Sequence, residues 1–439
     1  MSTYPYNLVA DVAKVCKTLA KRKYNSAPDL PPDGIVQTLF DVAFHASFLT
    51  EEGRRPGFRL IYYSPGDFKN DSKPPVYRKF RLLPLIQEKP YAVSEINRLA
   101  PAAELERSLI CVYDASKTPG KSDLRIWGLL DVGDNWSKFV HNEVSGGMPP
   151  PKRLTITSTT PGDISISSQG EIILTLRHGK ISYPTMGALW NGAISDFFDK
   201  ARENLYKDAV KAVQAKVWDK AGHDDNYPHR FFTDFLERIL YYVRLRKHGG
   251  SILVVPDYLT HSDSRLTDRV TLKYPCKYDY AWESLVESLA QHRRYYDLYF
   301  PLSSGKLELT QARFDEFCRL SGNEEGVNDR VADIAKTIAS LTSVDGAVVM
   351  TDKFRVIGFG GEVTAISTSL HEVTLADNRP NTILIESFGT RHRSAFRFCS
   401  SFEDSVAFVV SQDGGAKAIK RVGADVLLWP DINTGFLGL

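Results

Sequence analysis

The sequence predicts an α/β protein, α+β overall, that is built from two or three domains. Its 439 residues exceed what one ordinary hydrophobic core accommodates. Short runs of alternating apolar and polar residues, separated by turn residues, occur between 154 and 177 and are typical of antiparallel strands. From residue 229 onward, helical patterns lead into apolar strands, which predicts a mixed central sheet flanked by helices.

The composition is that of a globular protein, with 43% hydrophobic and 25% charged residues. The net charge of +2 argues against a surface that coats polyanions, so no nucleic-acid partner is expected. No apolar run approaches the roughly 18 to 20 residues that cross a bilayer, and the N-terminus lacks a signal-peptide core. We therefore expect no membrane partner. The cysteines are odd in number and scattered, which favours buried thiols and the cytoplasm over structural zinc or disulfides. They are Cys16, Cys111, Cys276, Cys318 and Cys399.

Residues 1–185 are predicted to form an α+β domain of their own. Apolar residues at helical spacing predict a helix over 33–50, with Asp33 as its N-cap. The nearly continuous apolar run 124–130 predicts a strand that is buried on both faces. Further strands are expected at 58–63, 109–113, 154–158, 164–168 and 171–177, the last three as a meander.

Residues 186–225 are predicted to be a helical connector, because 194–218 carry a helical pattern without glycine or proline. A second helix is expected over 229–246. Its end is rich in basic residues, which suit a helix C-terminus, and Gly249 and Gly250 stop it. A buried strand, 251–256, follows at once.

The C-terminal domain is predicted to span 226–439 around the central sheet. A helical region rich in aromatic residues covers about 281–325. A helix over 329–341 then leads to Asp345 and to an apolar run that predicts a buried strand. The remaining strands are expected at 355–359, 382–385, 407–410 and 416–421.

The run GTRHRSA at 389–395 carries the strongest chemical signal of the chain. Two guanidiniums and an imidazole stand in three successive residues, a poor structural element and a good clamp for a polyphosphate. The triplet Asp-Gly-Ala at 345–347 offers a carboxylate for a metal ion. Each pattern alone has a plainer interpretation, since Asp-Gly is commonly a turn and Arg-His-Arg is commonly a solvated face. Together the two patterns predict nucleotide chemistry.

Four features in this order resemble the DAC domain of bacterial diadenylate cyclases. They are a basic helix end that leads through RLRKHGGSILVV into a strand, the DGA triplet, the GTRHRSA run, and the strand AFVVS at 407–411. The resemblance spans about 225–435. It implies a nucleotidyltransferase that condenses two ATP into the second messenger cyclic di-AMP, with release of pyrophosphate. It also implies that two DAC domains meet face to face, so that activity needs at least a homodimer, and that Mg²⁺ or Mn²⁺ is required.

The resemblance assigns roles to individual residues. Asp345 is implied to bind the metal and to activate the attacking 3′-hydroxyl. Arg391, His392 and Arg393 are implied to hold the triphosphate and to stabilise the departing pyrophosphate, as forked guanidiniums match phosphate oxygens. The other positions implied in ATP binding are Gly346, Ala347, Gly389, Thr390 and Ser411.

The chain departs from the family pattern in two places. Many members follow the terminal serine with a glutamate that helps to hold metal, whereas this chain has Gln412 and then Asp413, which becomes the candidate second metal ligand. The helical region 281–325 is an insertion relative to compact members. It is interpreted as extra packing or an oligomer contact, with a lid or a regulator of dimerisation as the alternative.

The N-terminal part resembles, more loosely, the sensor domains that precede divergent DAC domains (DACNV-like). The residues that carry this resemblance are FHASFLTEEGRRPGFRLIYY at 44–63 and SLICVYDASKTPGKSDLRIWGLLDVG at 108–133. A regulatory role for residues 1–185 is therefore implied. Two alternatives to an active diadenylate cyclase stay open. One is a catalytically inactive DAC-like protein that senses a bound nucleotide, which Gln412 and the long insertion favour. The other is a cyclase with a different nucleotide product.

Overall fold

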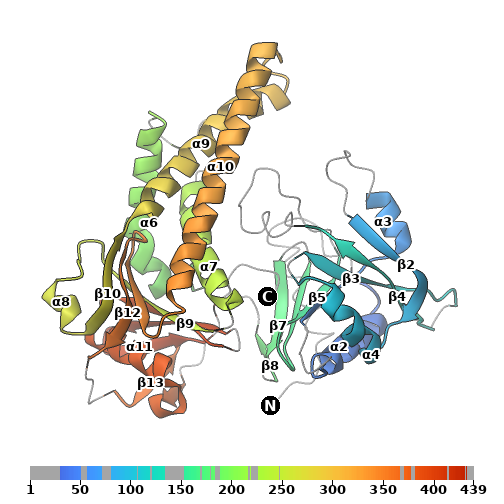
Figure 1. The fold of residues 1–439 in the computed structure, drawn as a ribbon, viewed down its shortest axis with the longest axis horizontal. Helices are drawn as coiled ribbons and strands as arrows, with labels where there is room; N and C mark the ends of the chain where they lie inside the picture. The colour runs from blue at the N-terminus through green and yellow to red at the C-terminus, as the bar shows by residue number, and fades with distance from the viewer. Residues whose placement is uncertain are drawn as a thin grey trace. The chain divides into compact units, whose positions relative to one another are not determined.

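The chain is a mixed α+β protein with two sheets, as predicted (Figure 1). The computed structural model describes residues 30–50, 57–71, 81–105, 107–118, 121–133, 153–168, 171–177, 179–182, 188–215, 218, 226–246, 248–365, 370–376, 381–412, 415–430 and 432. The chain divides into two compact units. The described residues up to 182 belong to the first unit, and those from 188 onward belong to the second.

The first unit contains an eight-stranded sheet and short helices. Its helices are α2 (Asp33–Ala46), α3 (Pro65–Asp71), α4 (Val93–Leu99) and the 3-10 turn η4 (Ala100–Ala102). Its strands are β1 (Phe58–Tyr62), β2 (Arg81–Pro90), β3 (Ser108–Asp114), β4 (Leu124–Asp131), β5 (Thr155–Ser158), β6 (Ile164–Ser168), β7 (Glu171–Arg177) and β8 (Lys180–Ser182). The strand order is β2-β4-β3-β1-β5-β6-β7-β8. Helices α2 and α4 cover one hydrophobic core, in which Phe40 and Ile96 meet Leu60 and Ile110.

Most of the elements predicted for this unit are confirmed. Strands β5, β6 and β7 form the expected antiparallel meander. Strand β4 is largely buried along its length, as its apolar run predicts. The N-cap prediction is wrong: Pro32 is the N-cap of α2, and Asp33 is its first helical residue. The helix also ends at Ala46, because a turn over Ser47 and Phe48 follows it.

The second unit contains a nine-stranded sheet. Its helices are α6 (Ala193–Ala212), α7 (Tyr227–Leu245), α8 (Ser264–Thr267), α9 (Tyr280–Ser303), α10 (Gln311–Leu341), the 3-10 turn η5 (Ile385–Ser387) and α11 (Thr390–Ser401). Its strands are β9 (Gly250–Val255), β10 (Val270–Tyr278), β11 (Ala347–Thr351), β12 (Val356–Val363), β13 (Glu372–Leu375), β14 (Thr382–Leu384), β15 (Val406–Val410), β16 (Ala416–Val422) and β17 (Asp425–Trp429). The strand order is β10-β12-β11-β9-β15-β16-β17-β13-β14.

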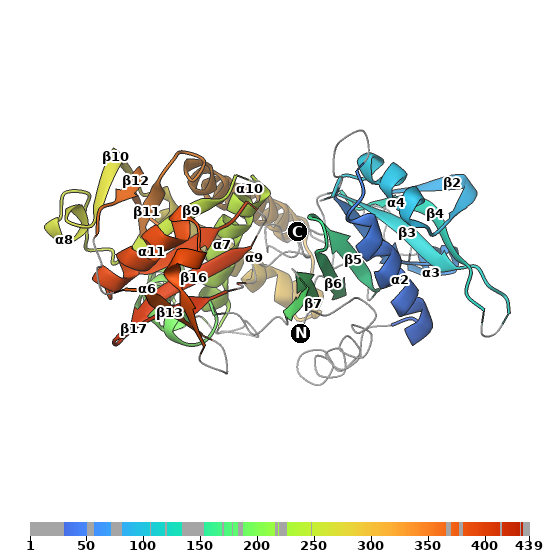
Figure 2. The same ribbon diagram turned by 90° about the horizontal axis from the view of Figure 1, so that it is seen from below.

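Helices cover both faces of this second sheet. Ile252 and Val254 of β9 pack in the same core as α6, α7, α9 and α10. Leu253 and Val255, whose side chains alternate with these, pack in a separate core with α11. Figure 2 shows α11 lying across the strands of the sheet. Strand β9 is therefore buried on both faces, which explains its continuous apolar sequence.

Helices α9 and α10 form a long hairpin whose tip projects from the sheet (Figure 1). Leu285 and Leu289 of α9 and Val331 and Ile338 of α10 belong to the core at its base. Helix α10 is continuous over its 31 residues. It therefore contains both the last part of the predicted helical region 281–325 and the predicted helix 329–341. Its C-cap, Thr342, lies very close to Gly250. A Cβ added at Gly250 would stand 2.5 Å from the Cβ of Thr342.

Several features of the second unit differ from the sequence expectations. Helix α6, expected in a connector, packs on α7, α9 and β16 and so belongs to the second unit. The run 389–395 is the start of helix α11 and not an irregular clamp. Cys318 is exposed on α10, while Cys111 and Cys399 are buried as expected. Strands β10, β13 and β17 have no counterpart among the predicted strands.

Asp352, directly after β11, makes the stability of the second unit depend on pH. Burial, with Asp257 nearby, raises the pKa of Asp352 from 3.8 to about 6. The folded chain therefore keeps a proton that the unfolded chain loses between about pH 4 and 6, so stability falls as the pH rises through this range. We expect Asp352→Asn to remove this loss, a gain of about 1 to 3 kcal/mol over wild type between pH 4.5 and 7.5. Urea unfolding at both pH values measures it, and the exposed Asp329→Asn is the control. Equal pH dependence of Asp352→Asn and wild type would contradict the prediction.

Candidate functional site

A cavity of about 430 Å³ lies where the N-terminal ends of β9 and β11 meet β12 and the first turn of α11. Residues that are distant in sequence share its wall. The predicted site residues among its lining are Asp345, Gly346, Ala347, Thr390 and Arg391. Ser394 lines the cavity as well. The structure thus brings the Asp-Gly-Ala triplet and the start of the GTRHRSA run to one place.

Gly346 holds the turn between α10 and β11 in a conformation that other residues rarely adopt. Its φ is +113°, and a Cβ at this position would stand 2.6 Å from the carbonyl carbon of Gly360. The backbone of the turn therefore lies directly against β12. Asp345 is exposed beside it, at the rim of the cavity, and forms no ion pair with any residue that the structure describes. Its carboxylate is thus available to a ligand.

The first turn of α11 presents backbone N–H groups at the cavity. Gly389 is the N-cap, and the first i to i−4 bond runs from Arg393 N to Gly389 O at 3.1 Å. The preceding N–H groups lack a partner within the helix, and they give its N-terminus a partial positive charge. A Cβ at Gly389 would meet nothing within 4 Å, so the space beside the cap is open. Backbone N–H groups and the helix dipole there suit an anion.

The three basic residues of the run point to different places. Arg391 lines the cavity, and its Nη1 donates a hydrogen bond to His248 O at 3.3 Å. The His392 ring packs on Phe388 and Phe396, with centroid distances of 5.6 and 6.5 Å. His392 and Arg393 are half-buried and are not among the described residues that line the cavity. Within one chain, Arg391 alone of the three faces the cavity.

The predicted Gly-Gly and Ser411 meet at the same edge of the sheet. Gly249 has φ +70°, and a Cβ there would stand 2.8 Å from Val410 O and 3.2 Å from Arg391 Nη1. Val410 pairs with Gly250, so Ser411 follows at the edge where β9 begins. Ser411 donates from its backbone N to Gly415 O at 2.9 Å and does not line the cavity. The four sequence features that resemble the DAC domain therefore converge on one edge of the sheet.

Two charged cavity residues had no sequence signal that we recognised. Lys273 of β10 and Glu362 of β12 both line the cavity. Strand β10 pairs with β12 so that Thr271 lies opposite Glu362. Lys273, two residues after Thr271, therefore projects on the same face of the sheet as Glu362. The side chain of Lys273 packs over Gly360, because a Cβ added at Gly360 would stand 3.2 Å from the Cβ of Lys273. The alternation in VTLKYPCKY was the signal that could have revealed this strand.

The donor set at the cavity suits a metal that is held mainly by a bound substrate. Within the part of the chain that the structure describes, no group of three His, Cys, Asp or Glu could hold a metal ion. Asp345 supplies one carboxylate, and the predicted second ligand, Asp413, lies outside the described residues. Mg²⁺ commonly binds through one or two carboxylates together with substrate phosphates. Asp345 fits that arrangement.

Comparison with known proteins identifies part of the first unit. Residues 25–131 match the family model described as "Probable sensor domain DACNV". A search of curated proteins found no match. A search of solved structures also found none. The chain thus carries a match to a probable sensor domain.

The DACNV match covers α2, α3, α4 and strands β1 to β4 of the first unit. It contains the segments 44–63 and 108–131, on which the predicted sensor resemblance largely rests. The cavity residues of the second unit lie outside the DACNV match. Among the described helices, none is long and apolar enough to cross a membrane.

Proposed function

We propose that this protein is a diadenylate cyclase whose second unit condenses two ATP into cyclic di-AMP, under the control of its N-terminal sensor unit. One observation carries the proposal. Asp345, before β11, and Arg391, at the N-terminus of α11, face the same cavity. A carboxylate, a guanidinium and the N-terminus of a helix around one cavity supply what a nucleoside triphosphate with its metal requires.

In the proposed reaction, each cavity binds one ATP, and two copies of the second unit bring their cavities face to face. The 3′-oxygen of one ATP forms a bond to the α-phosphorus of the other. The bond from that phosphorus to the β-phosphate oxygen breaks, and pyrophosphate leaves. The same step in the opposite direction closes the ring and releases a second pyrophosphate. A homodimer is therefore the smallest active species under this proposal.

The proposed roles follow from the positions of the side chains. Asp345, exposed at the rim, is placed to accept the proton of the attacking hydroxyl and to bind Mg²⁺ or Mn²⁺. The metal would screen the phosphate charges and polarise the attacked phosphorus. Arg391, Thr390 and the N–H groups of α11 would hold the triphosphate and stabilise the leaving pyrophosphate. Arg393 and His392, which do not line the cavity of their own chain, would contribute by supporting this turn.

A nucleotide-binding protein without turnover is the second candidate. Gln412 supports it, because an amide cannot supply the negative charge that many family members place after the terminal serine. ATP binding without pyrophosphate release, at concentrations where the chain is dimeric, would favour this candidate over the cyclase.

The deciding experiment incubates the purified full-length chain with ATP and Mn²⁺ or Mg²⁺ and identifies products by mass spectrometry. We expect cyclic di-AMP and pyrophosphate, with a rate per chain that rises as the protein dimerises. Arg391→Ala is expected to lower the rate about 10- to 100-fold, because it removes a guanidinium that meets the leaving group. The matched control is Arg397→Ala, an exposed arginine of the same helix. Equal rates for the two variants would contradict the role of Arg391.

The same assay on residues 188–439, which keep α6, tests control by the sensor unit.

A further inference from the structure

A second cavity, of about 680 Å³, lies at the opposite edge of the second sheet from the candidate nucleotide site. The first cavity touches the N-terminal ends of β9 and β11, at Ser251 and Ala347. The second touches their C-terminal ends, at Asp257 and Asp352. Its other walls come from helix α6, from the loop before β15 and from the end of β16. This second cavity has no part in the proposed cyclase reaction.

The wall of the second cavity carries charges of both signs, most of which are not joined in ion pairs. Seven charged side chains that line it form no ion pair with any residue that the structure describes. They are Asp196, Lys200, Asp352, Glu403, Asp404, Lys420 and Arg421. Four carboxyl groups and three cations therefore remain available to a ligand at this cavity.

The cations on β16 are held by backbone oxygens and not by carboxylates. Lys420 Nζ donates to Glu403 O at 3.1 Å and stands 5.1 Å from the centre of the Phe197 ring. Arg421 donates to Gly423 O at 2.8 Å and to Ser400 O at 3.0 Å. Burial lowers the pKa of Lys420, which means that its charge lacks full compensation. These bonds orient both cations and leave them their full charge, so a carboxylate is a suitable partner.

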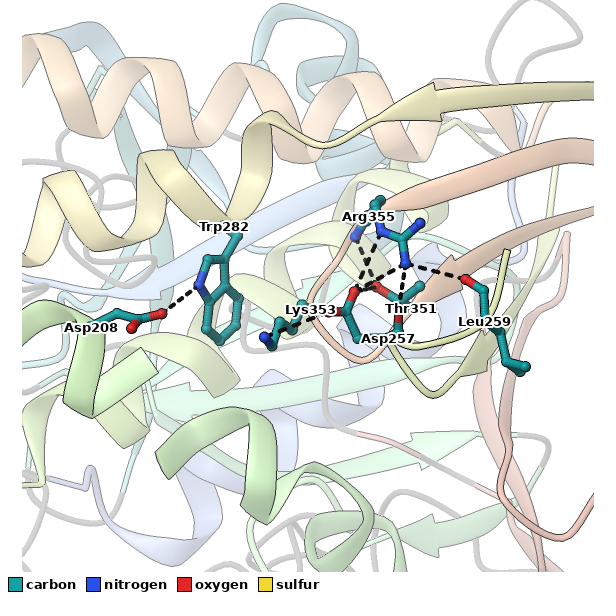
Figure 3. Close-up of polar contacts among 7 residues, drawn as sticks. All are labelled: Asp208, Asp257, Leu259, Trp282, Thr351, Lys353 and Arg355. Atoms are coloured by element: carbon teal, nitrogen blue, oxygen red, sulfur yellow. Dashed lines mark hydrogen bonds and ion pairs between the residues drawn. The ribbon is translucent and has the colours of Figure 1, made fainter. Parts of the chain in front are cut away.

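The floor of the second cavity is fixed by a separate network (Figure 3). Arg355 donates to the side chain and the backbone oxygen of Asp257 and to Leu259 O, and Lys353 Nζ lies 3.5 Å from Asp257 Oδ2. Asp257 is thereby paired with two cations.

The wall formed by α6 is fixed as well. Asp208 of α6 accepts a hydrogen bond from Trp282 Nε1 of α9 at 2.9 Å, which ties α6 to the helical layer (Figure 3). The second cavity is therefore formed before any ligand arrives, and little binding energy is needed to order it.

We propose that the second cavity binds a zwitterionic small molecule that carries an ammonium and a carboxylate, in the class of free amino acids and short peptides. A ligand with negative charge alone would meet the carboxylates of Asp196, Glu403 and Asp404. A ligand with positive charge alone would meet Lys200, Lys420 and Arg421. A dipolar ligand satisfies both sets, and Phe197 and Tyr258 offer apolar surface to its side chain.

Binding here has a direct structural consequence. Lys200 and Asp196 lie on α6, whereas Lys420 lies on the sheet, so a ligand that contacts both holds α6 against the strand ends. Strands β9 and β11 run from this edge to the candidate nucleotide site. The site is thus a position for regulation by a metabolite, and its existence does not depend on cyclase activity.

The test is isothermal titration of the full-length chain with single L-amino acids and with alanylalanine. We expect at least one of these probes to bind, and its N-acetylated and its amidated forms, which each lack one charge, to bind about tenfold more weakly or worse. Lys200→Gln and Glu403→Gln are expected to weaken binding to a similar extent. Both side chains are exposed, so the variants should fold.

The controls are Lys207→Gln, an exposed residue of the same helix, and Lys273→Gln in the first cavity. Both should bind the probe as wild type does. The proposal is overturned if no probe binds, if the acetylated or amidated forms bind equally well, or if Lys273→Gln abolishes binding. Inorganic phosphate and spermidine serve as single-sign probes, and tighter binding of either than of every zwitterion would also overturn it.

Discussion

Replacing Asp345 with asparagine is expected to lower cyclic di-AMP formation by at least about 100-fold, the largest effect on activity that we predict. Asparagine keeps the shape of the side chain but removes its charge and its ability to accept a proton. The change should not affect folding, because Asp345 is exposed and forms no ion pair with any described residue. Initial rates of pyrophosphate release with Mn²⁺ measure the effect, and thermal unfolding checks the fold.

The matched control for this variant is Asp329→Asn, an exposed aspartate on α10, the helix that leads to Asp345. It should retain the wild-type rate. The prediction also has a second part: Asp345→Asn should still bind ATP, because Arg391 and the N-terminus of α11 remain. A wild-type rate for Asp345→Asn would remove the catalytic role of this residue, whatever the rate of the control.

Gly346→Ala is expected to destabilise the second unit by about 2 to 4 kcal/mol, the largest effect on stability that we predict. The added methyl group would stand 2.6 Å from Gly360 C and 2.8 Å from Gly361 N, and both contacts are with backbone. The φ of +113° is also unfavourable for alanine. Strands β11 and β12 must separate to relieve the clash, which would deform the first cavity. Urea unfolding, followed by tryptophan fluorescence, measures the loss.

Gly326→Ala provides a control of opposite sign. Gly326 lies within α10, and a Cβ there would meet nothing within 4 Å. Alanine is the better helix former, so this variant should gain roughly 0.5 to 1 kcal/mol. If Gly346→Ala proves as stable as Gly326→Ala, the close approach of the Gly346 turn to β12 is not present in solution.

The sequence predicted the elements that are buried on a regular pattern. Strand β9 and the meander of β5 to β7 were found because burial imposes a continuous or alternating apolar sequence. Strand β10 was missed because it is an edge strand that exposes most of its residues and contains Pro275. Helix α11 was missed because its first turn is polar and charged, so no apolar residue at helical spacing precedes Ala395 and Phe396, which begin its buried face.

Some residues of the candidate site could be predicted from the sequence, and others could not. Asp345 and Arg391 were placed together by the resemblance to the DAC domain, whose motifs occur in this chain in the same order. Lys273 and Glu362 could not be predicted, because their places in the cavity depend on the register between β10 and β12. Register is set by tertiary packing, which no local pattern in the chain encodes. The inward packing of His392 on Phe388 was hidden for the same reason.

The continuity of α10 gives the hairpin a mechanical property. A helix of 31 residues is about 46 Å long at 1.5 Å per residue, and here it ends a few residues before Asp345. The C-cap of α10, Thr342, packs closely against Gly250, and the neighbouring Gly249 lies close to the guanidinium of Arg391. The helix is therefore one continuous element that connects the tip of the hairpin with the region beside the first cavity. A partner that holds the distant tip would therefore also act on the backbone that leads from α10 to Asp345.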